Sequence, residues 1–313
     1  MTATRVAAID CGTNSIRLLI ADLDPATGEI ADLDRRMIIN RLGQGVDSTG
    51  RLHPDALERT FAACREYAEI IAAHGVGPER IRFVATSASR DAENAAEFTE
   101  GVRGILGVVP EVVSGDEEAR LSFTGATKEL TGGSLKPPYL VFDLGGGSTE
   151  FVLGGDEVQA ARSVDIGCVR MTERHFGGAE LPTEDQIARA KTDILAALDT
   201  AAETVPLTEA ATLVGLAGTV TTVAGIVLGL PEYDSAKIHH ARLDVEQVRA
   251  TATRLLHSTH AERMAIPVMH PGRADVIAAG ALVLLEIMER TGAAEVVVSE
   301  HDILDGIAWS IAR

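Results

Sequence analysis

The chain has 313 residues, of which 46% are hydrophobic and 24% are charged, so it can bury a substantial core, and its length favours two domains. Its net charge is −18, with 28 basic against 46 acidic residues and no cluster of Lys and Arg, which argues against a DNA- or RNA-binding protein. The longest apolar run, Val276–Leu285, has about ten residues, whereas a membrane span needs about 20. We therefore expect a soluble protein without a membrane partner.

The cysteines and the start of the chain bear on localisation. Cys11, Cys64 and Cys168 are scattered and form no CxxC pair, which is typical of a reducing compartment. The first five residues run directly into the strand-like Val6–Ile9, and this pattern is not that of a signal peptide. We expect a cytoplasmic protein.

In the first half of the chain, short apolar strands alternate with amphipathic helices. One helix should start at Pro54, because proline suits a first turn, and should end at Gly75 after apolar residues at 3–4 spacing. The other predicted elements are strands Val6–Asp10, Ile16–Asp22, Met37–Asn40, Ile81–Ala85 and Glu111–Val113, and helices Ala95–Leu106 and from about Asp116.

The second half repeats this alternation. The predicted strands are Tyr139–Leu144, Glu150–Leu153, Ala211–Val214 and Glu295–Ser299, and the predicted helices are Glu184–Glu203, Val245–His257, Ala274–Arg290 and Ile303–Ala312. Mixed strands and helices in this order indicate an α/β protein built in layers.

An internal repeat relates the two halves. The segment Ile9–Ser15 aligns with Phe142–Ser148 at a constant offset of 133 residues, so that Asp10 matches Asp143 and Ser15 matches Ser148. In both copies an apolar strand precedes the aspartate and a β-rich segment follows the glycine turn. A duplicated strand–turn–strand unit predicts two similar domains that face each other across a cleft.

Both turns have the composition of a phosphate site. Glycines allow backbone N–H groups to approach an anion closely, and Thr and Ser hydroxyls add further donors. An aspartate at the end of the strand supplies carboxylate oxygens for magnesium. The sequence has no Gly-x-x-x-x-Gly-Lys-Ser/Thr loop, which excludes P-loop chemistry. The predicted donors to phosphate are Gly12, Thr13, Asn14, Ser15, Arg17, Gly145, Gly146, Gly147, Ser148 and Thr149.

At these residues the chain resembles the exopolyphosphatase / guanosine pentaphosphate phosphohydrolase (Ppx/GppA) family. Asp10–Arg17 and Asp143–Glu150 resemble its two phosphate motifs, and Ala85–Ala92 with Asn94 resembles its phosphate-binding arginine segment. Ser114–Arg120 resembles the segment with its catalytic glutamate, and Gly215–Thr219 resembles the nucleoside-side turn of the actin-like superfamily.

The resemblance implies a role for several residues. Glu118 would be the base that activates a water molecule, with the adjacent Glu117 as its rival, and Arg90 would clamp a phosphate. Asp143 and Glu150, with Asp10 as a third carboxylate, would lie near Mg²⁺ or Mn²⁺, and Gly218 and Thr219 would form the nucleoside-side turn.

The fold implied is a duplicated actin-like ATPase (ASKHA, ribonuclease H-like) α/β fold with an interdomain cleft. We predict domains at 1–126 with 299–313 and at 127–298. Longer relatives continue into helical C-terminal domains, whereas this chain stops at Arg313, so we expect a preference for short polyphosphates. The resemblance also allows a homodimer, although the sequence contains no diagnostic interface.

Several alternatives remain open at this point. The motifs do not separate hydrolysis of polyphosphate from hydrolysis of guanosine pentaphosphate (pppGpp), ATP or ADP. A non-catalytic sensor of polyphosphate or nucleotide is a different class of function. A sugar kinase of the same fold is disfavoured, since no sugar-binding insertion is visible.

Four other features point to weaker hypotheses. Cys11 lies in the first turn, but without a histidine partner we interpret it as a buried residue at a strand end. His239-His240 with His257 and His260 could form a metal cluster, but the polar residues between His257 and His260 suggest a helix end instead. The His301-Asp302 pair lacks the further histidines that an HD phosphohydrolase needs. Arg170 is a candidate both for a substrate contact and for a structural ion pair.

Overall fold

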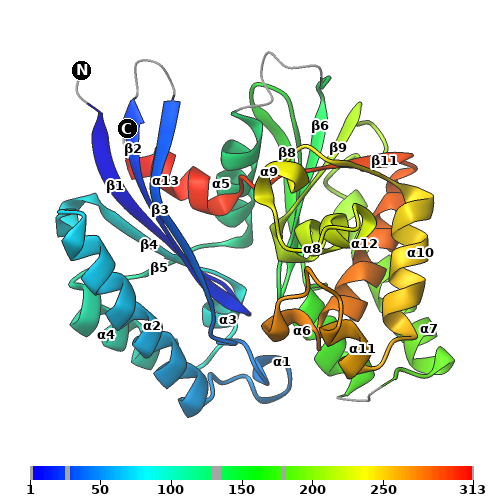
Figure 1. The fold of residues 1–313 in the computed structure, drawn as a ribbon, viewed down its shortest axis with the longest axis horizontal. Coiled ribbons are helices and arrows are strands. Elements are labelled where there is room, and N and C mark those ends of the chain that lie inside the picture. Colours follow the sequence, from blue (N-terminus) through cyan, green and yellow to red (C-terminus); the bar gives the residue numbers. More distant parts are fainter. Residues whose placement is uncertain (1–2, 25–28, 129–134, 178–180, 312–313) are drawn as a thin grey trace. The chain divides into compact units, whose positions relative to one another are not determined.

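The computed structural model describes residues 3–24, 29–128, 135–177 and 181–311. The chain forms two compact units, one made of Met1–Gly125 and Ile303–Arg313 and the other of Ala126–Asp302 (Figure 1). The bounds predicted from the sequence lie within four residues of these. None of the described helices has the length and apolar character needed to cross a membrane.

The first unit is built on a five-stranded sheet with the strand order β3-β2-β1-β4-β5. In β1, Val6 and Ala8 face one cluster of buried residues, whereas Ala7, Ile9 and Cys11 face another, as the two-residue period of a strand requires. Its strands are β1 (Thr4–Cys11), β2 (Ser15–Asp24), β3 (Glu29–Ile39), β4 (Ile81–Ala85) and β5 (Glu111–Val112).

Helices cover both faces of this sheet. The cluster on one face contains residues of α2 and α4, and the cluster on the other face contains residues of α5 and of α13, which closes the unit at the end of the chain. Pro54 starts α2 and Gly75, at φ 69°, follows its end, as predicted. The helices are α1 (Val46–Thr49), α2 (Pro54–Ala73), α3 (Ser87–Arg90), α4 (Ala95–Leu106), α5 (Gly115–Thr127) and α13 (Ile303–Ile311).

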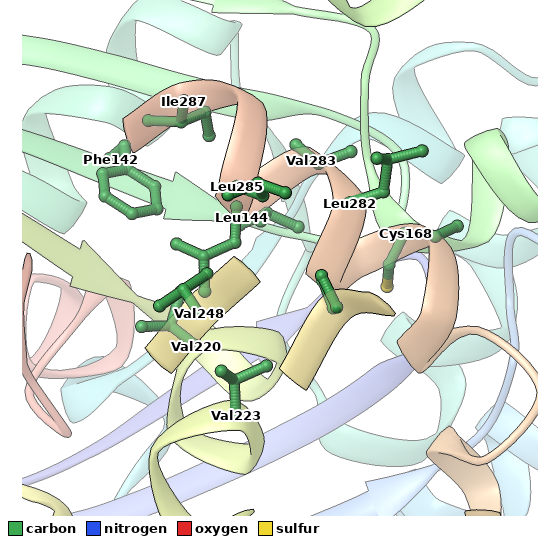
Figure 2. Packing of buried hydrophobic residues seen from close by; sticks show 14 of the residues in the cluster. Phe142, Leu144, Cys168, Val220, Val223, Val248, Leu282, Val283, Leu285 and Ile287 are labelled. Carbon is green, nitrogen blue, oxygen red and sulfur yellow. The ribbon is translucent and has the colours of Figure 1, made fainter. Parts of the chain in front are cut away.

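The second unit has a six-stranded sheet with the order β10-β11-β9-β6-β7-β8. Buried Phe142 and Leu144 of β6 belong to the same cluster as Val220 and Val223 of α8 and apolar residues of α12 (Figure 2). The strands are β6 (Tyr139–Leu144), β7 (Thr149–Gly154), β8 (Val158–Val164), β9 (Thr212–Leu216), β10 (Arg242–Asp244) and β11 (Glu295–Val298).

The helices of this unit begin where the sequence supplies caps. Thr183 and Asp244 each form a capping box, at the starts of α7 and α10. The helices are α6 (Cys168–Met171), α7 (Glu184–Ala202), α8 (Ala217–Val227), α9 (Ser235–Ile238), α10 (Val245–Leu256), α11 (His260–Met264) and α12 (Ile277–Thr291).

Several elements differ from the sequence prediction, among them α8 and β10, which were not predicted. Met37–Asn40 was predicted as part of a third strand, and β3 also includes the charged segment that precedes Met37, because that segment pairs with β2. Strand β8 was not predicted, and the last long helix begins at Ile277 rather than at Ala274, after a 3₁₀ turn at Pro271–Arg273. Helix α13 matches the predicted Ile303–Ala312, of which Ala312 lies outside the described residues.

Candidate active site

The repeat that the sequence predicts is also a structural repeat. The first turn is closed by a hydrogen bond from Gly12 N to Ser15 O of 2.9 Å, and the second by the matching bond from Gly145 N to Ser148 O of 3.1 Å. Each turn joins two antiparallel strands, β1 to β2 and β6 to β7. The offset of 133 residues therefore holds in the backbone as well as in the sequence.

In the first unit, three predicted motifs follow three parallel strands. β1, β4 and β5 pair in parallel, so their carboxyl ends lie at the same edge of the sheet. The first glycine turn follows β1, the arginine segment follows β4, and the glutamate segment follows β5. Loops at the carboxyl ends of parallel strands are the usual ligand sites of open α/β sheets.

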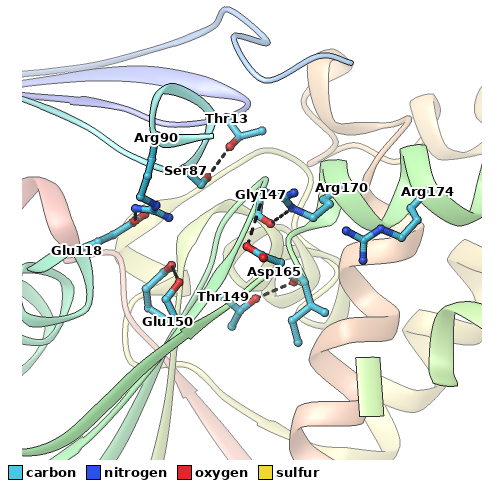
Figure 3. A network of polar contacts seen from close by, with 12 residues as sticks. Thr13, Ser87, Arg90, Glu118, Gly147, Thr149, Glu150, Asp165, Arg170 and Arg174 are labelled. Atoms are coloured by element: carbon cyan, nitrogen blue, oxygen red, sulfur yellow. Dashed lines mark hydrogen bonds and ion pairs between the residues drawn. The ribbon is translucent and has the colours of Figure 1, made fainter. Parts of the chain in front are cut away.

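The structure separates the two adjacent glutamates of α5. Glu118 is buried and accepts a hydrogen bond of 3.1 Å from Arg90 Nη1, which also donates to the carbonyl of Val113 (Figure 3). Glu117 is half-exposed and binds Arg82 at 2.8 Å. Consecutive helical residues point in different directions. Glu118 is therefore the glutamate that contacts Arg90, whereas Glu117 forms a separate ion pair with Arg82.

The polar side chains of the first turn bind protein partners. Asp10 is buried and accepts hydrogen bonds of 3.0 and 2.7 Å from Arg17 Nε and Nη2. The hydroxyls of Thr13 and Ser87 are 2.9 Å apart, which links the turn to α3 (Figure 3). Asn14 and Ser15 are partly exposed. Arg17, which was predicted to contact phosphate, thus neutralises Asp10 in this unit.

The second unit also places its motifs at one edge. β6, β9 and β11 are parallel, so the second glycine turn, the Gly218 turn and residues 299–302 follow strands that end on the same side. Asp143 and Glu150 stand opposite each other on β6 and β7, so both side chains project from the same face of the sheet. Both are buried, and Ser163 donates a hydrogen bond of 2.7 Å to Glu150 Oε1.

This carboxylate pair suits a metal that keeps most of its water. Over the described part of the chain, no group of three or more His, Cys, Asp or Glu side chains is arranged to hold a metal. Mg²⁺ needs fewer protein ligands than that, because it usually binds one or two carboxylates together with water and substrate phosphates. Asp143 and Glu150 fit this donor set.

Thr149 differs from its predicted role. Its side chain is fully buried, and its hydroxyl donates a hydrogen bond of 2.8 Å to the carbonyl of Ile166 (Figure 3). This contact ties the start of β7 to the segment that precedes α6. Thr149 therefore supports the turn from the inside instead of offering its hydroxyl to phosphate, and Ser148, Gly146 and Gly147 remain as the candidates of this turn.

The predicted nucleoside-side turn between β9 and α8 is covered by an arginine. Arg273 Nη1 donates to the carbonyl of Gly218 and to the hydroxyl of Thr222, and a Cβ at Gly218 would lie 2.1 Å from the guanidinium carbon. Thr219 is buried, and a Cβ at Gly280 of α12 would lie 2.7 Å from its hydroxyl. Both residues are thus packed against other parts of the second unit.

The weaker hypotheses gain no support. Cys11 is 1% exposed, and burial raises the pKa of its thiol well above the ordinary value, as expected for a core residue and not for a nucleophile. The rings of His239 and His240 stack at 3.8 Å, and His301 stacks on His239 at 5.0 Å. His257 binds the Thr253 carbonyl and Glu184, and these contacts raise its pKa.

Two segments hold the turns; the one at Arg41–Gly43 was not predicted as functional, whereas in the other only Arg170 was a candidate. Backbone N–H groups of Arg41 and Gly43 bind the carbonyls of Asn14 and Thr13, at 3.0 and 2.8 Å. Residues 167–170 do the same for the second turn. Gly43 and Gly167 were the available signals, because an unexplained glycine often marks a close backbone contact.

Comparison with known proteins agrees with the family resemblance of the sequence motifs. Residues 19–313 match the model of the Ppx/GppA phosphatase family. The chain is 49% identical to Exopolyphosphatase 2 of Mycobacterium tuberculosis over 100% of both proteins. It is also 33% identical to the bifunctional 3-dehydroquinate synthase/phosphatase of Fusobacterium nucleatum, over 96% of this chain and 45% of that protein.

Solved structures agree with the sequence relatives. A crystal structure of an exopolyphosphatase-like protein matches with a TM-score of 0.94 and 44% identity, over 99% of this chain and 98% of that one. A Ppx/GppA family member of Aquifex aeolicus matches with a TM-score of 0.79 and 32% identity, over 99% and 98% of the two chains. The protein thus belongs to the Ppx/GppA phosphatase family.

Proposed function

We propose that the protein is an exopolyphosphatase that removes the terminal phosphate of inorganic polyphosphate. The observation that carries this proposal is the position of the motifs, because in each unit the glycine turn and its companion segments follow parallel strands at one edge of the sheet. Full-length similarity to Exopolyphosphatase 2 supports the same activity.

In the proposed reaction, the oxygen of a water molecule bonds to the terminal phosphorus, and the bond from that phosphorus to the bridging oxygen breaks. The products are orthophosphate and a chain shortened by one phosphate. Glu118 accepts the proton of the water, and Arg90 holds the carboxylate of Glu118 in place through its hydrogen bond of 3.1 Å. The glycine turns bind phosphate oxygens through backbone N–H groups.

The metal proposed for this reaction is Mg²⁺, with Mn²⁺ as a substitute. Asp143 and Glu150 would hold it, since both are buried and project from the same face of adjacent strands. A bound divalent cation supplies positive charge to phosphate oxygens. The positive charge of the cation would also allow a protein with a net charge of −18 to bind a polyanion, because it reverses the sign of the local electrostatic potential.

The β9–α8 turn favours polyphosphate over a nucleotide as the substrate. Arg273 covers the carbonyl of Gly218, so a ligand at this turn would meet the guanidinium group instead of exposed backbone atoms. A guanidinium suits further phosphates along a chain, because it matches the geometry of phosphate oxygens. Release of phosphate from pppGpp is the second candidate, since it involves the same bond.

The test is phosphate release by the purified protein from short and long polyphosphate, pppGpp, ATP and ADP, with and without Mg²⁺. We expect polyphosphate to be the best substrate by kcat/KM, short chains to be preferred, and EDTA to abolish release. If phosphate is released preferentially from pppGpp, then pppGpp and not polyphosphate is the substrate. If no substrate is hydrolysed but polyphosphate or pppGpp binds, the protein is a sensor.

A further inference from the structure

The carbonyl groups of the second glycine turn all bind one short segment. Cys168 N donates to Gly145 O at 3.0 Å, and Val169 N and Arg170 N donate to Gly146 O at 2.8 and 3.1 Å. Gly147 O accepts from Gly167 N at 3.2 Å and from Arg170 Nε at 2.7 Å (Figure 3). Every carbonyl between the first and the last glycine of the turn therefore points toward residues 167–170.

Peptide geometry then determines where the N–H groups point. In a planar trans peptide the carbonyl of one residue and the N–H of the next point in opposite directions. The peptide bonds of this turn are trans. The N–H groups of Gly146, Gly147 and Ser148 therefore point away from residues 167–170, and none of them donates to a protein acceptor within the described ranges. Three adjacent N–H donors on one side of a turn form an anion site.

Gly167 is required for close contact rather than for its backbone conformation. Its φ and ψ are −88° and 160°, which any residue adopts. A Cβ at this position, however, would lie 2.2 Å from the carbonyl carbon of Gly146 and 2.4 Å from the nitrogen of Gly147. Both are backbone atoms of the phosphate turn itself, so a methyl group here must displace the turn.

The segment is anchored on its other side by the core. Cys168, Val169 and Met171 are buried in the main cluster of the second unit. A Cβ on Gly280 of α12 would lie 3.0 Å from Cys168 Cβ, so α6 is held between the turn and α12. Displacement must therefore fall on the turn, because α6 has no space into which to retreat.

The first turn has the same arrangement, built from a different segment. Arg41 N and Gly43 N donate to the carbonyls of Asn14 and Thr13. A Cβ on Gly43 would lie 2.3 Å from Thr13 Cγ2. A backbone clamp that includes a glycine thus recurs in the two copies of the repeat, although the two clamps lie at unrelated distances from their turns in the sequence.

We infer that Gly167 is a positioning residue for phosphate binding: through residues 168–170 it keeps the N–H groups of Gly146, Gly147 and Ser148 directed at the substrate. This inference rests on the proposed function in one respect, namely that the second turn binds phosphate. It adds the residue that sets the direction of the donors and predicts which amide protons contact the ligand.

The first test uses Gly167→Ala, with Gly104→Ala as the matched control, because a Cβ on Gly104 of α4 meets no atom within 4 Å. We expect the KM for polyphosphate to rise tenfold or more in Gly167→Ala and to stay unchanged in Gly104→Ala. Partial misfolding lowers the active fraction and therefore kcat, but it leaves KM unchanged. An unchanged KM in Gly167→Ala overturns the inference.

The second test does not depend on how Gly167→Ala folds. Glu118→Gln protein labelled with ¹⁵N-glycine is titrated with inorganic tripolyphosphate and Mg²⁺, and we expect the amide signals of Gly146 and Gly147 to shift while that of Gly104 stays. Unmoved signals for Gly146 and Gly147, or no binding of tripolyphosphate, overturn the inference. If these signals shift but wild-type protein hydrolyses no polyphosphate, the proposed enzyme activity fails while phosphate binding by the second turn, on which the inference rests, stands.

Discussion

Glu150 stands opposite Asp143 at the position where the first copy of the repeat pairs Arg17 with Asp10. The two turns have the same closing hydrogen bond, yet one copy carries an ion pair and the other two buried carboxylates. Two nearby carboxylates favour a bound cation, because each disfavours ionisation of the other in its absence. The repeat has thus diverged into one copy neutralised by Arg17 and one suited to a metal.

We predict that Glu150→Gln raises the Mg²⁺ concentration needed for half-maximal phosphate release by about tenfold, which corresponds to about 1.4 kcal/mol. The change keeps the shape of the side chain and removes one of the two charges. Glu157→Gln, at an exposed position after β7, is the control and should leave the Mg²⁺ dependence unaltered. An identical Mg²⁺ dependence for Glu150→Gln and wild type would exclude Glu150 as a ligand.

The two adjacent glutamates of α5 provide a second, internally controlled prediction. Glu118→Gln should lower kcat by about 10²-fold or more, because general-base catalysis typically contributes this much. Glu117→Gln should retain nearly full activity, since Glu117 is half-exposed and bound to Arg82. Steady-state rates on tripolyphosphate, with binding of tripolyphosphate measured separately, check both. The assignment is reversed if Glu117→Gln is the inactive variant.

The sequence identifies which residues form the site better than it identifies where their side chains point. The repeat at an offset of 133 predicts both turns correctly, because the glycines and aspartates that form them are local signals. Glu117 and Glu118 are indistinguishable in sequence, and contacts with residues distant in the sequence separate them: Glu117 binds Arg82, 35 residues away, and Glu118 binds Arg90, 28 residues away. The contact of the Thr149 hydroxyl is likewise invisible in the sequence, since its partner Ile166 is 17 residues away.

Two of the strands that the sequence prediction missed or showed only in part have little apolar surface. β3 includes Asp32, Asp34, Arg35 and Arg36, and only its last residues show an apolar pattern. It lies at the edge of its sheet, where charged side chains are tolerated and prevent pairing with other chains. β8 is also an edge strand, with a sequence of Ala, Gln, Arg and Ser between two valines. Both strands form because they pair with a neighbouring strand, and not because of an apolar pattern in their own sequence.

The clamp on the first turn predicts a suppressor. Gly43→Ala should raise the KM for polyphosphate several-fold, because the new methyl would lie 2.3 Å from Thr13 Cγ2. Adding Thr13→Ser removes that methyl and keeps the hydroxyl that binds Ser87, so the double variant should recover most of the wild-type KM. Thr13→Ser alone is the control. A double variant as impaired as Gly43→Ala would show that the contact with Cγ2 is not the cause.

Glu286 predicts a pH dependence of stability. It is buried in α12, where Lys191 binds Oε1 at 2.9 Å and Oε2 has no hydrogen-bond partner within the described residues. Burial raises the pKa of Glu286, and Lys191 only partly offsets this effect. From the ordinary glutamate pKa upward, the native state therefore keeps a proton that the unfolded chain has lost, and the stability contributed by this group falls as pH rises.

We therefore expect Glu286→Gln, which does not ionise, to gain stability relative to wild type between pH 5 and pH 8. Urea unfolding midpoints at the two pH values measure the difference. Glu69→Gln, on the exposed side of α2, should show no such trend. A difference between wild type and Glu286→Gln that stays constant with pH contradicts the raised pKa.

The last described helix is joined to β3 by an ion pair in which only the carboxylate is buried. Asp305 of α13 is 1% exposed and binds Arg35 of β3 at 2.5 Å, and Arg35 also binds Asp32. Burial lowers the pKa of Arg35, but its two carboxylate partners outweigh this and leave the pKa above its ordinary value. The guanidinium therefore stays charged, and removing the charge of Asp305 leaves this partly exposed cation with Asp32 as its remaining carboxylate partner.

Asp305→Asn should accordingly lower the free energy of unfolding by about 2 kcal/mol, between the values usual for an exposed and for a buried ion pair, because Asp305 is buried and Arg35 is partly exposed. Replacing both members, with Arg35→Met and Asp305→Leu, should cost less, because no buried charge is left without its partner and Asp32, which loses Arg35, is exposed. Asp34→Asn breaks the more exposed pair with Arg36 on the same strand and should cost at most about 1 kcal/mol. Urea unfolding followed by the fluorescence of Trp309, which lies in α13, measures all three. A double variant less stable than Asp305→Asn would mean that the pair itself, and not the unpaired charge, determines how firmly α13 is held.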